Sequence, residues 1–427
     1  MNSFLFNPRS SVFIRVPQHF FQCCLFLFLS LILFSCSSES KGPAPTWTFL
    51  VYMDGDNNLG SSAIEDIDEM KAIGSTDNVQ VIVQLDLPQG ITTKRYRIVK
   101  NDWELISDLG ELDMANPQTL TDFLVWAKDA YPADRVVLVL WNHGNGWDQG
   151  DGPSQPAAGI SRKSIFYDED NKSPFLANHQ VKKAIQASGI KLDVLGLDAS
   201  IMGTIEALYE FKDLAPIIIS SQEVGESHGW YYTPILSQLT GNPRMNTEDL
   251  SRIIVDSYHD FLESYFYPAF PTYEKRHTIA ALRTACLGTL ATEVDSLAAG
   301  LRSQLSDPAT SAQTVASIGA ARSNAQEIDH YIQPGVYVDL QDFDRLFTGG
   351  SSISSTIAEG TIKEYHGDAR PNAHGVSIVF FRSRTINTYD KNYRNYDAQT
   401  GFGNGGDFIN HYHWDEFLDT YYSAAGL

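Results

Sequence analysis

Residues 194–203, VLGLDASIMG, decide the fold predicted for this chain. The apolar run 194–197 reads as a short buried strand, and Ser200 follows its C-terminal end. A second run of the same kind, 136–141, is rich in valine and leucine, and His143 follows it two residues later. In an open parallel α/β sheet the carboxyl ends of the strands form the crevice where ligands bind. We therefore expect the Ser200 hydroxyl and the His143 imidazole to share one pocket.

Apolar β-rich runs alternate with amphipathic helical runs along most of the chain, which is typical of a mostly parallel sheet covered by helices on both faces. The predicted strands are 46–53, 79–85, 95–99, 136–141, 194–197 and 216–220. Ser62 and Glu65 form a capping-box pattern that predicts the start of a helix, and Pro117 predicts the start of another. We expect one α/β domain over residues 46–240 and an appended mixed α/β region over residues 241–427.

The charge balance excludes some partners. The chain has 52 Asp and Glu residues against 31 Lys and Arg residues, a formal net charge of −21. The electric field of this negative charge repels nucleic acids and anionic lipid surfaces, so no nucleic-acid partner is expected. It favours basic peptides or proteins, although many secreted proteins are acidic without any such partner.

Residues 1–36 have the pattern of an export signal. Two arginines precede the apolar run 20–34, which is too short to span a bilayer comfortably. The run ends in Leu-Phe-Ser-Cys at Cys36 and resembles the lipobox of bacterial lipoproteins, in which the cysteine carries the lipid. Residues 37–45 would then be a tether, and the protein would be anchored in the bacterial cell envelope, in the periplasm or at the surface. A plain secretory leader cleaved nearby is the alternative.

Further motifs occur in a fixed order after Thr46. They are WTFLVYMDGDNNLG, DIDEMKAIGS, VQVIVQLD, VVLVLWNHGNGW, LGLDASIMGTIEALYE, SSQEVGESHGWYY, YVDLQDF, HGVSIVFF and WDEFLDTYY. Together they resemble the clostripain-like cysteine peptidases over almost all of the remaining chain. The resemblance implies a caspase-like three-layer α/β sandwich, hydrolysis of peptides, and no required cofactor.

The resemblance also assigns roles to individual residues. His143 matches the catalytic histidine, and Gly144 matches the residue whose backbone N–H points into the oxyanion hole. Ser200 stands where the family has its nucleophilic cysteine, and its own N–H would be the second oxyanion donor. Asp198 matches the acidic residue of the first specificity pocket in members that cleave after Arg or Lys, because a carboxylate suits a guanidinium.

Serine at position 200 changes the expected chemistry. A thiol with a pKa of about 8.5 is partly ionised at neutral pH, whereas an alcohol keeps its proton until a base removes it. No residue of the sequence is identified as one that orients His143. Taken alone, Ser200 could also be an ordinary helix N-cap. We expect activity to be lost or strongly reduced; a substituted nucleophile in an otherwise active peptidase and a working Ser-His pair remain open.

Two function classes follow. The first is an extracytoplasmic, Arg/Lys-directed endopeptidase scaffold in which Ser200 replaces the cysteine. The second is a pseudopeptidase, a binding module that holds basic peptides on the bacterial surface with Asp198.

Members of the family can be activated by cleavage of their own chain after a basic residue, and Lys163 in the loop 149–172 is the candidate site. A plain solvated residue is the alternative there, and Ser200 is expected to prevent self-cleavage.

A calcium site is a further hypothesis. Four oxygen-bearing residues fall at positions 1, 3, 5 and 12 of an EF-hand-like loop: Asp54, Asp56, Asn58 and Glu65. Leu59 occupies the position that wants a glycine for the sharp turn, and a turn followed by a helix cap explains the same residues. Calcium dependence known in the resembled family supports testing this ion.

Overall fold

The computed structural model describes residues 46–147, 176–328, 335–383 and 406–427, with short pieces at Tyr393, Tyr396–Asp397 and Phe402–Gly403. The chain divides into two compact units, residues 1–43 and 44–427, and the described residues all lie in the second. The predicted export signal with Cys36, the tether, and the loop that contains Lys163 lie outside the described residues. None of the helices in the described ranges is both long and apolar enough to cross a membrane.

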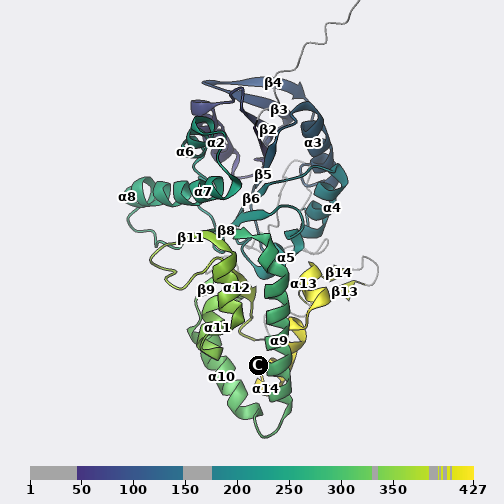
Figure 1. The fold of residues 1–427 in the computed structure, drawn as a ribbon, viewed down its shortest axis with the longest axis vertical. Coiled ribbons are helices and arrows are strands. Elements are labelled where there is room, and N and C mark those ends of the chain that lie inside the picture. Colours follow the sequence, from purple (N-terminus) through teal and green to yellow (C-terminus); the bar gives the residue numbers. More distant parts are fainter. Residues whose placement is uncertain are drawn as a thin grey trace, which may run out of the picture. The chain divides into compact units, whose positions relative to one another are not determined.

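A nine-stranded sheet is the centre of the described residues (Figure 1), and its order is β11-β8-β7-β6-β5-β1-β2-β3-β4. Its strands are β1 (Trp47–Asp54), β2 (Val79–Leu87), β3 (Ile91–Val99), β4 (Asp102–Asp108), β5 (Arg135–Trp141), β6 (Val194–Asp198), β7 (Ile217–Ser220), β8 (Thr278–Arg283) and β11 (Thr361–His366). The five central strands β2, β1, β5, β6 and β7 run parallel, and the outer strands on both sides are antiparallel. All six predicted strands are confirmed.

Two hydrophobic clusters cover the two faces of the sheet. Successive residues of β1 alternate between them: Leu50 and Tyr52 belong to one cluster, and Phe49 and Val51 belong to the other. The first cluster takes in residues of α3 (Pro117–Ala130), α4 (Asn178–Ser188) and α5 (Ile205–Phe211). The second takes in residues of α2 (Gly60–Ile73), α6 (Tyr232–Gly241) and α7 (Thr247–Phe261). Because both faces are covered, β1 is buried along its whole length, as the uninterrupted apolar pattern predicts.

The helix starts were predicted with mixed success. Pro117 opens α3 as expected, and the side chain of Asn116 caps it by accepting a hydrogen bond from the Gln118 N–H. The capping box at Ser62 is wrong, because α2 begins at Gly60 and Ser62 lies inside it. The reason is an Asx turn: the Asn57 side chain accepts the Leu59 N–H at 2.8 Å, which closes the loop and starts the helix earlier.

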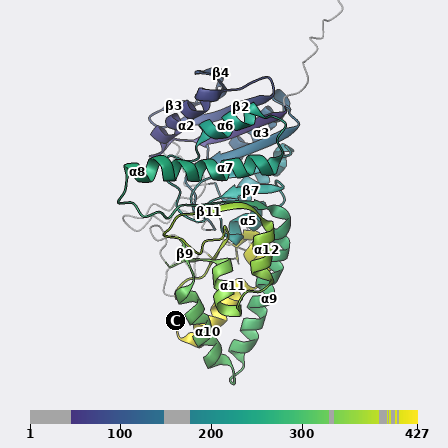
Figure 2. The same cartoon turned by 60° about the vertical axis from the view of Figure 1, so that its left-hand side comes forward.

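The chain after residue 241 completes the sheet and adds a mostly helical region. Its helices are α9 (Leu287–Ser306), α10 (Ser311–Asn324), α11 (Leu340–Thr348), α12 (Ser352–Gly360), α13 (Gly406–His411) and α14 (Trp414–Ala425). Figure 2 shows α9, α10, α11 and α12 gathered beyond β11. A small antiparallel sheet of β9 (Glu327–Ile328), β10 (Tyr337–Asp339) and β12 (Ser377–Val379) lies in this region. The Ser377 N–H of β12 donates to the carbonyl of Gly203, which lies in the segment after β6, at 2.8 Å. This region therefore supports the turn after β6.

Candidate active site

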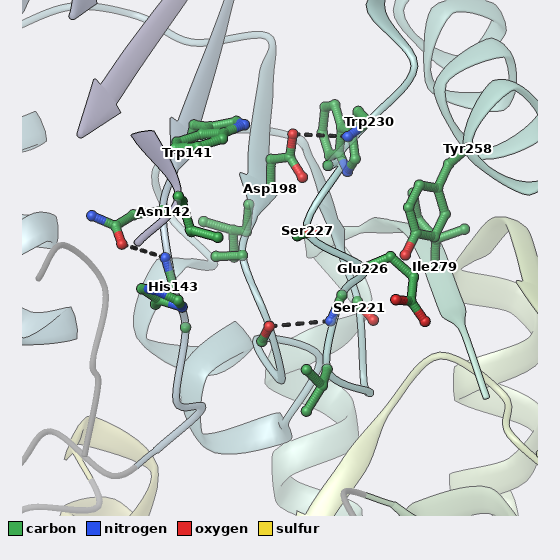
Figure 3. A pocket seen from close by; sticks show the side chains of 18 of the residues that line it. Trp141, Asn142, His143, Asp198, Ser221, Glu226, Ser227, Trp230, Tyr258 and Ile279 are labelled. Atoms are coloured by element: carbon green, nitrogen blue, oxygen red, sulfur yellow. Dashed lines mark hydrogen bonds between the residues drawn. The ribbon is translucent and has the colours of Figure 1, made fainter. Parts of the chain in front are cut away.

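A cavity of about 360 Å³ opens at the carboxyl ends of β5 and β6. These strands are parallel neighbours in which Trp141 pairs with Asp198, so His143 and Ser200 both come two residues after paired positions. Both side chains line the cavity, and Figure 3 shows His143 just past the end of the strand that neighbours the one carrying Asp198. The structure therefore brings the imidazole and the hydroxyl into one pocket, as the strand pattern predicts.

The backbones of Gly144 and Ser200 touch. A Cβ atom on residue 144 would lie 2.1 Å from the Ser200 carbonyl oxygen and 2.9 Å from the Ser200 nitrogen. No side chain fits there, so glycine is required for this contact. The two segments that carry the predicted oxyanion donors are thus held against each other.

The turn after Ser200 is strained. Ile201 has a φ of +63°, a left-handed conformation that a β-branched residue rarely adopts. Such a residue costs on the order of 1 to 3 kcal/mol, and the surrounding structure must hold it in place. The Ile201 side chain is fully buried, and its N–H donates to the Glu223 carbonyl at 3.0 Å. Ser200 therefore lies on a sharp turn and is not a helix N-cap; Thr204 caps α5 instead.

The loop that follows β7 positions the Ser200 hydroxyl. The Gly225 N–H donates to Ser200 Oγ at 3.1 Å. This loop is in turn fixed by Thr278 of β8, whose hydroxyl accepts the N–H groups of Gln222 and Glu223, both at 2.9 Å. Within the described part of the chain, the Ser200 hydroxyl makes no hydrogen bond with His143.

Residues that follow β1 hold the histidine. His143 Nε2 lies 3.0 Å from Asn58 Oδ1, and since an amide oxygen only accepts, Nε2 carries the proton in this contact. The Asn142 side chain accepts the His143 N–H and donates to Asp54 Oδ2 at 2.6 Å. The contact between Asn58 and His143 could not be predicted from the sequence, because only the strand order of the folded sheet places β1 beside β5.

Asp198 lines the same cavity and is buried. Its Oδ2 atom accepts the Trp230 N–H at 3.1 Å and the Tyr232 hydroxyl at 2.8 Å. Burial raises the pKa of Asp198 to about 6, although these two hydrogen bonds act in the opposite direction. Asp198 is therefore mostly ionised at neutral pH.

Glu226 is a second acidic residue of the cavity and was not among the predicted site residues. Burial raises its pKa above the ordinary value. Figure 3 shows Glu226 beside Tyr258 and Ile279, on the far side of the cavity from His143. Its position in the motif VGESHGW, directly after Gly225, is the signal that would have found it.

Asp66 lies behind Asp198 and shares its electrostatic environment. Asp66 Oδ2 accepts the Trp141 indole N–H at 2.6 Å. Both carboxylates approach Gly229: a Cβ atom there would lie 3.0 Å from Asp198 Oδ2 and 3.1 Å from Asp66 Oδ2. Burial, together with the charges of Asp198 and Glu69, raises the pKa of Asp66 well above its ordinary range. A negative charge on either carboxylate therefore opposes ionisation of the other.

The structure does not bring together the four residues of the predicted calcium loop. Asp54 and Asp56 are adjacent, since the Asp56 N–H donates to Asp54 Oδ1 at 3.2 Å, but Asn58 contacts His143 and Glu65 is exposed on α2. The Asp56 carboxylate instead lies within 4.8 Å of the carboxylates of Asp86 and Glu111. Asp86 pairs with Asp54 across β1 and β2, a proximity that linear spacing does not show.

The chain is similar to known peptidases in sequence and in fold. The model of the clostripain family matches residues 51–421. Clostripain from Hathewaya histolytica is 26% identical over 242 residues, which are 50% of this chain and 46% of that protein. The match thus spans about half the length of this curated relative.

Two solved structures share the fold. A secreted C11 cysteine protease from Bacteroides thetaiotaomicron, in complex with an irreversible peptide inhibitor, is 18% identical with a TM-score of 0.62 and covers 86% of this chain and 99% of its own. An inactive zymogen C11 protease from Parabacteroides distasonis is 20% identical with a TM-score of 0.57, over 79% of this chain and 92% of its own. The predicted caspase-like α/β fold is confirmed.

This chain belongs to the clostripain family of C11 cysteine peptidases. Members of this family are peptidases, which act on peptides or proteins.

Proposed function

We propose that this chain is an extracytoplasmic clostripain-type peptidase scaffold that binds peptides through an Arg or Lys side chain and has little or no turnover. The observation that carries the proposal is the position of Asp198, buried in the same cavity as His143 and Ser200. A guanidinium or ammonium group that enters the cavity meets a buried carboxylate, and a hydrogen bond between two charged groups is strong when it is shielded from water. Glu226 adds a second acidic group to the same cavity.

Serine at position 200 limits the chemical step. In a cysteine enzyme the thiolate attacks the scissile carbonyl, and the N–H groups of Gly144 and residue 200 stabilise the oxyanion. His143 then gives a proton to the leaving amine, and a water molecule hydrolyses the acyl-enzyme. The serine hydroxyl must lose its own proton first, but in the described residues it makes no hydrogen bond with His143. With Nε2 of His143 protonated toward Asn58, the acid/base role falls to Nδ1.

One comparison tests this proposal. Purified wild-type protein and the Ser200→Cys variant are assayed with arginyl, lysyl and glutamyl reporter peptides, and binding of the uncleaved peptides is measured by calorimetry. We expect wild type to bind the two basic peptides with negligible turnover and Ser200→Cys to cleave them. A cysteine variant that neither cleaves nor binds basic peptides would contradict the proposal.

A binding module for basic peptides is the second candidate, and it is favoured by the intact cavity around Ser200. It predicts saturable binding by wild type, loss of binding on Asp198→Ala, and no turnover even in Ser200→Cys. The exposed Asp77→Ala variant is the matched control for a lost surface carboxylate. Turnover by Ser200→Cys separates the two functions.

We propose an extracytoplasmic, lipid-anchored location from the export pattern of residues 1–36. The structurally similar protease from Bacteroides thetaiotaomicron is secreted, which supports export. Metabolic labelling with a lipid analogue tests the anchor. Wild type should be labelled and Cys36→Ser should not; equal labelling of both would place the lipid elsewhere.

Calcium stays a proposal. The carboxylates of Asp56, Asp86 and Glu111 supply the oxygen chemistry that calcium prefers. To test calcium binding, the thermal midpoint of unfolding is measured with calcium and with a chelator, for wild type and for Asp86→Asn. Identical midpoints of wild type in both conditions would contradict the calcium proposal.

A further inference from the structure

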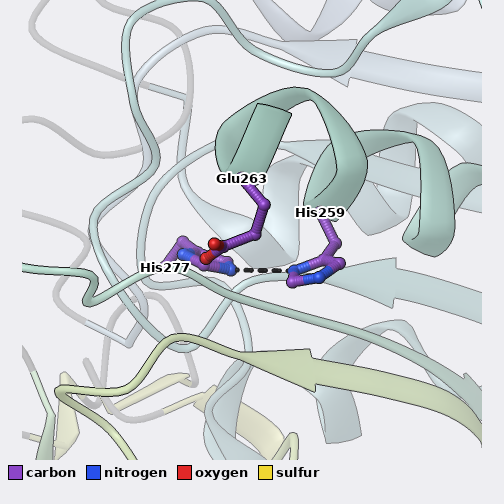
Figure 4. Close-up of side chains that lie close together, drawn as sticks. All are labelled: His259, Glu263 and His277. Atoms are coloured by element: carbon purple, nitrogen blue, oxygen red, sulfur yellow. Dashed lines mark hydrogen bonds between the residues drawn. The ribbon is translucent and has the colours of Figure 1, made fainter. Parts of the chain in front are cut away.

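Three metal-ligating side chains lie together outside the cavity, at the C-terminal end of α7 and before β8. They are His259, Glu263 and His277, shown in Figure 4. One ligand atom from each lies within 4.8 Å of the others. None of the three lines the cavity or enters the chemistry proposed for it.

The separation of the two imidazoles fits a shared metal ion. His259 Nδ1 is 3.2 Å from His277 Nε2. Zinc binds histidine nitrogen at about 2.0–2.1 Å in tetrahedral sites, which places two ligating nitrogens about 3.3 Å apart. His259 and Glu263 are four residues apart, so they face the same side of the helical segment. The two nitrogens already have the spacing that such an ion requires.

The outer contacts of His277 orient its ring toward the cluster. Its Nδ1 atom lies 3.0 Å from the Tyr267 hydroxyl, and its Nε2 atom therefore points to His259. Metal-bound histidines usually have such a hydrogen-bond partner on the second ring nitrogen. The backbone is also unusual here, since Leu262–Phe266 forms a π-helical turn that includes Glu263, and such turns are frequent at functional sites.

Glu263 supplies the third ligand of the cluster through its carboxylate. Glu263 forms an ion pair with Lys275 through Oε2, and its second oxygen, Oε1, is the candidate ligand.

Charges of both signs surround this cluster. The negative charges of Asp256, Asp260 and Glu263 act on His259, and the positive charge of Lys363 acts on it as well. Lys275 is a positive charge close to His277. His277 is only 2% exposed, whereas the Glu263 side chain is partly exposed. A metal ion would therefore reach the cluster from the side of Glu263.

We propose that His259, Glu263 and His277 bind one zinc ion. The ion would join the end of α7 to the start of β8. His259 and His277 are each next to a residue that lines the cavity, Tyr258 and Thr278. Because Thr278 fixes the loop that donates to Ser200, zinc would stabilise one wall of the candidate active site.

Zinc titration of the purified, chelator-treated protein tests the proposal. We expect one zinc per chain by calorimetry, and cobalt(II) should give the visible absorption of a tetrahedral nitrogen and oxygen site. His259→Gln and Glu263→Gln should each weaken zinc binding at least about tenfold. Loss of a mere hydrogen-bond partner of a metal ligand typically lowers metal affinity by that much, and these two residues would be ligands themselves. Zinc should also raise the thermal midpoint of wild type and leave those of the two variants unchanged.

Two histidine variants serve as controls. His413→Gln removes a histidine that is bonded to Asp295 elsewhere and should bind zinc like wild type. His143→Gln removes the histidine of the cavity and should also retain the site. Circular dichroism of each variant shows whether it is folded. Absence of zinc binding in wild type, unchanged affinity in folded His259→Gln and Glu263→Gln, or loss of binding in His143→Gln alone would each overturn the proposal.

Discussion

The backbone of Gly144 packs against the backbone of Ser200, and a Cβ atom on residue 144 would lie 2.1 Å from the Ser200 carbonyl oxygen. This contact joins the ends of β5 and β6 and sets the distance between the histidine segment and the turn that carries residue 200. A methyl group at position 144 can be accommodated only if one of the two segments moves.

We therefore predict that Gly144→Ala, made in the Ser200→Cys variant, lowers kcat/KM for an arginyl reporter peptide by about a hundredfold or more, the usual effect of losing an oxyanion donor. Gly241→Ala is the matched control, because no atom lies within 4 Å of a Cβ at that position. Equal activity of the two variants would mean that the contact between residues 144 and 200 has no role in catalysis.

The contact between Asn58 and His143 predicts a positioning role. In the Ser200→Cys variant, Asn58→Ala should lower kcat about tenfold or more with a smaller effect on KM, because the imidazole loses the partner of Nε2. The pH profile of kcat/KM should shift with it. Asn242→Ala removes an exposed asparagine and should change neither. A change in KM alone would assign Asn58 to peptide binding.

Binding of basic peptides should depend on the charge of Asp198. Its pKa of about 6 means that the ionised fraction, and with it the affinity for an arginyl peptide, rises about tenfold between pH 5 and pH 7. Asp198→Asn should bind weakly at both pH values. Calorimetric titrations at the two pH values measure this. If the affinity of Asp198→Asn for the arginyl peptide still depends on pH, Glu226 would be the carboxylate that binds the basic group.

Stability should fall as pH rises because of buried acids that stay protonated in the folded chain. Glu206 accepts the Val379 N–H at 3.1 Å and the Tyr393 hydroxyl at 2.9 Å, and burial raises its pKa to about 7. A raised carboxyl pKa means that the folded state binds more protons than the unfolded state. Its contribution is complete below the unfolded pKa and is lost as pH rises through about 7.

Glu206→Gln should therefore reduce the loss of stability between pH 5 and pH 8. At pH 8 it should raise the free energy of unfolding by about 1 to 3 kcal/mol, since one pKa unit corresponds to about 1.4 kcal/mol. Urea denaturation at both pH values measures this change. Part of the slope should remain, because the pKa of Glu69 is also raised to about 7, mainly by burial. The exposed Glu359→Gln variant should behave like wild type.

Self-cleavage should depend on residue 200. Wild type should run as one chain on a denaturing gel, whereas Ser200→Cys should give two fragments that divide after Lys163. Lys163→Ala in the cysteine variant should restore the intact chain. Fragments in wild type that disappear in Ser200→Ala would show that the serine itself acts as a nucleophile.

The central strands could be predicted because each is buried on both faces and reads as one apolar run. The two strands at the edges of the sheet, β4 and β11, could not. β4 is largely exposed and carries polar residues, and β11 has the sequence TIKEYH, which has no clear apolar pattern. Both depend on pairing with a neighbour in the sheet, which is information that no short window of sequence contains.

The candidate site shows the same division. His143, Ser200 and Asp198 follow or end two recognisable strands, and their motifs place them. Asn58 and Thr278 come from segments far away in sequence, and their roles depend on the sheet order that puts β1 beside β5 and β8 beside β7. The predicted calcium loop was drawn from linear spacing, which does not show that Asp86 pairs with Asp54 across two strands.

Because residue 200 is a serine, the cavity has no nucleophilic thiol at this position that could be oxidised. Among the described residues the free cysteine is Cys286, whose thiol contacts the Arg283 carbonyl and whose pKa is raised by burial. A protonated, half-buried thiol reacts slowly with oxidants and alkylating reagents. Whatever the cavity binds, it should bind equally well in oxidising and reducing surroundings, a tolerance that a cysteine nucleophile would not allow.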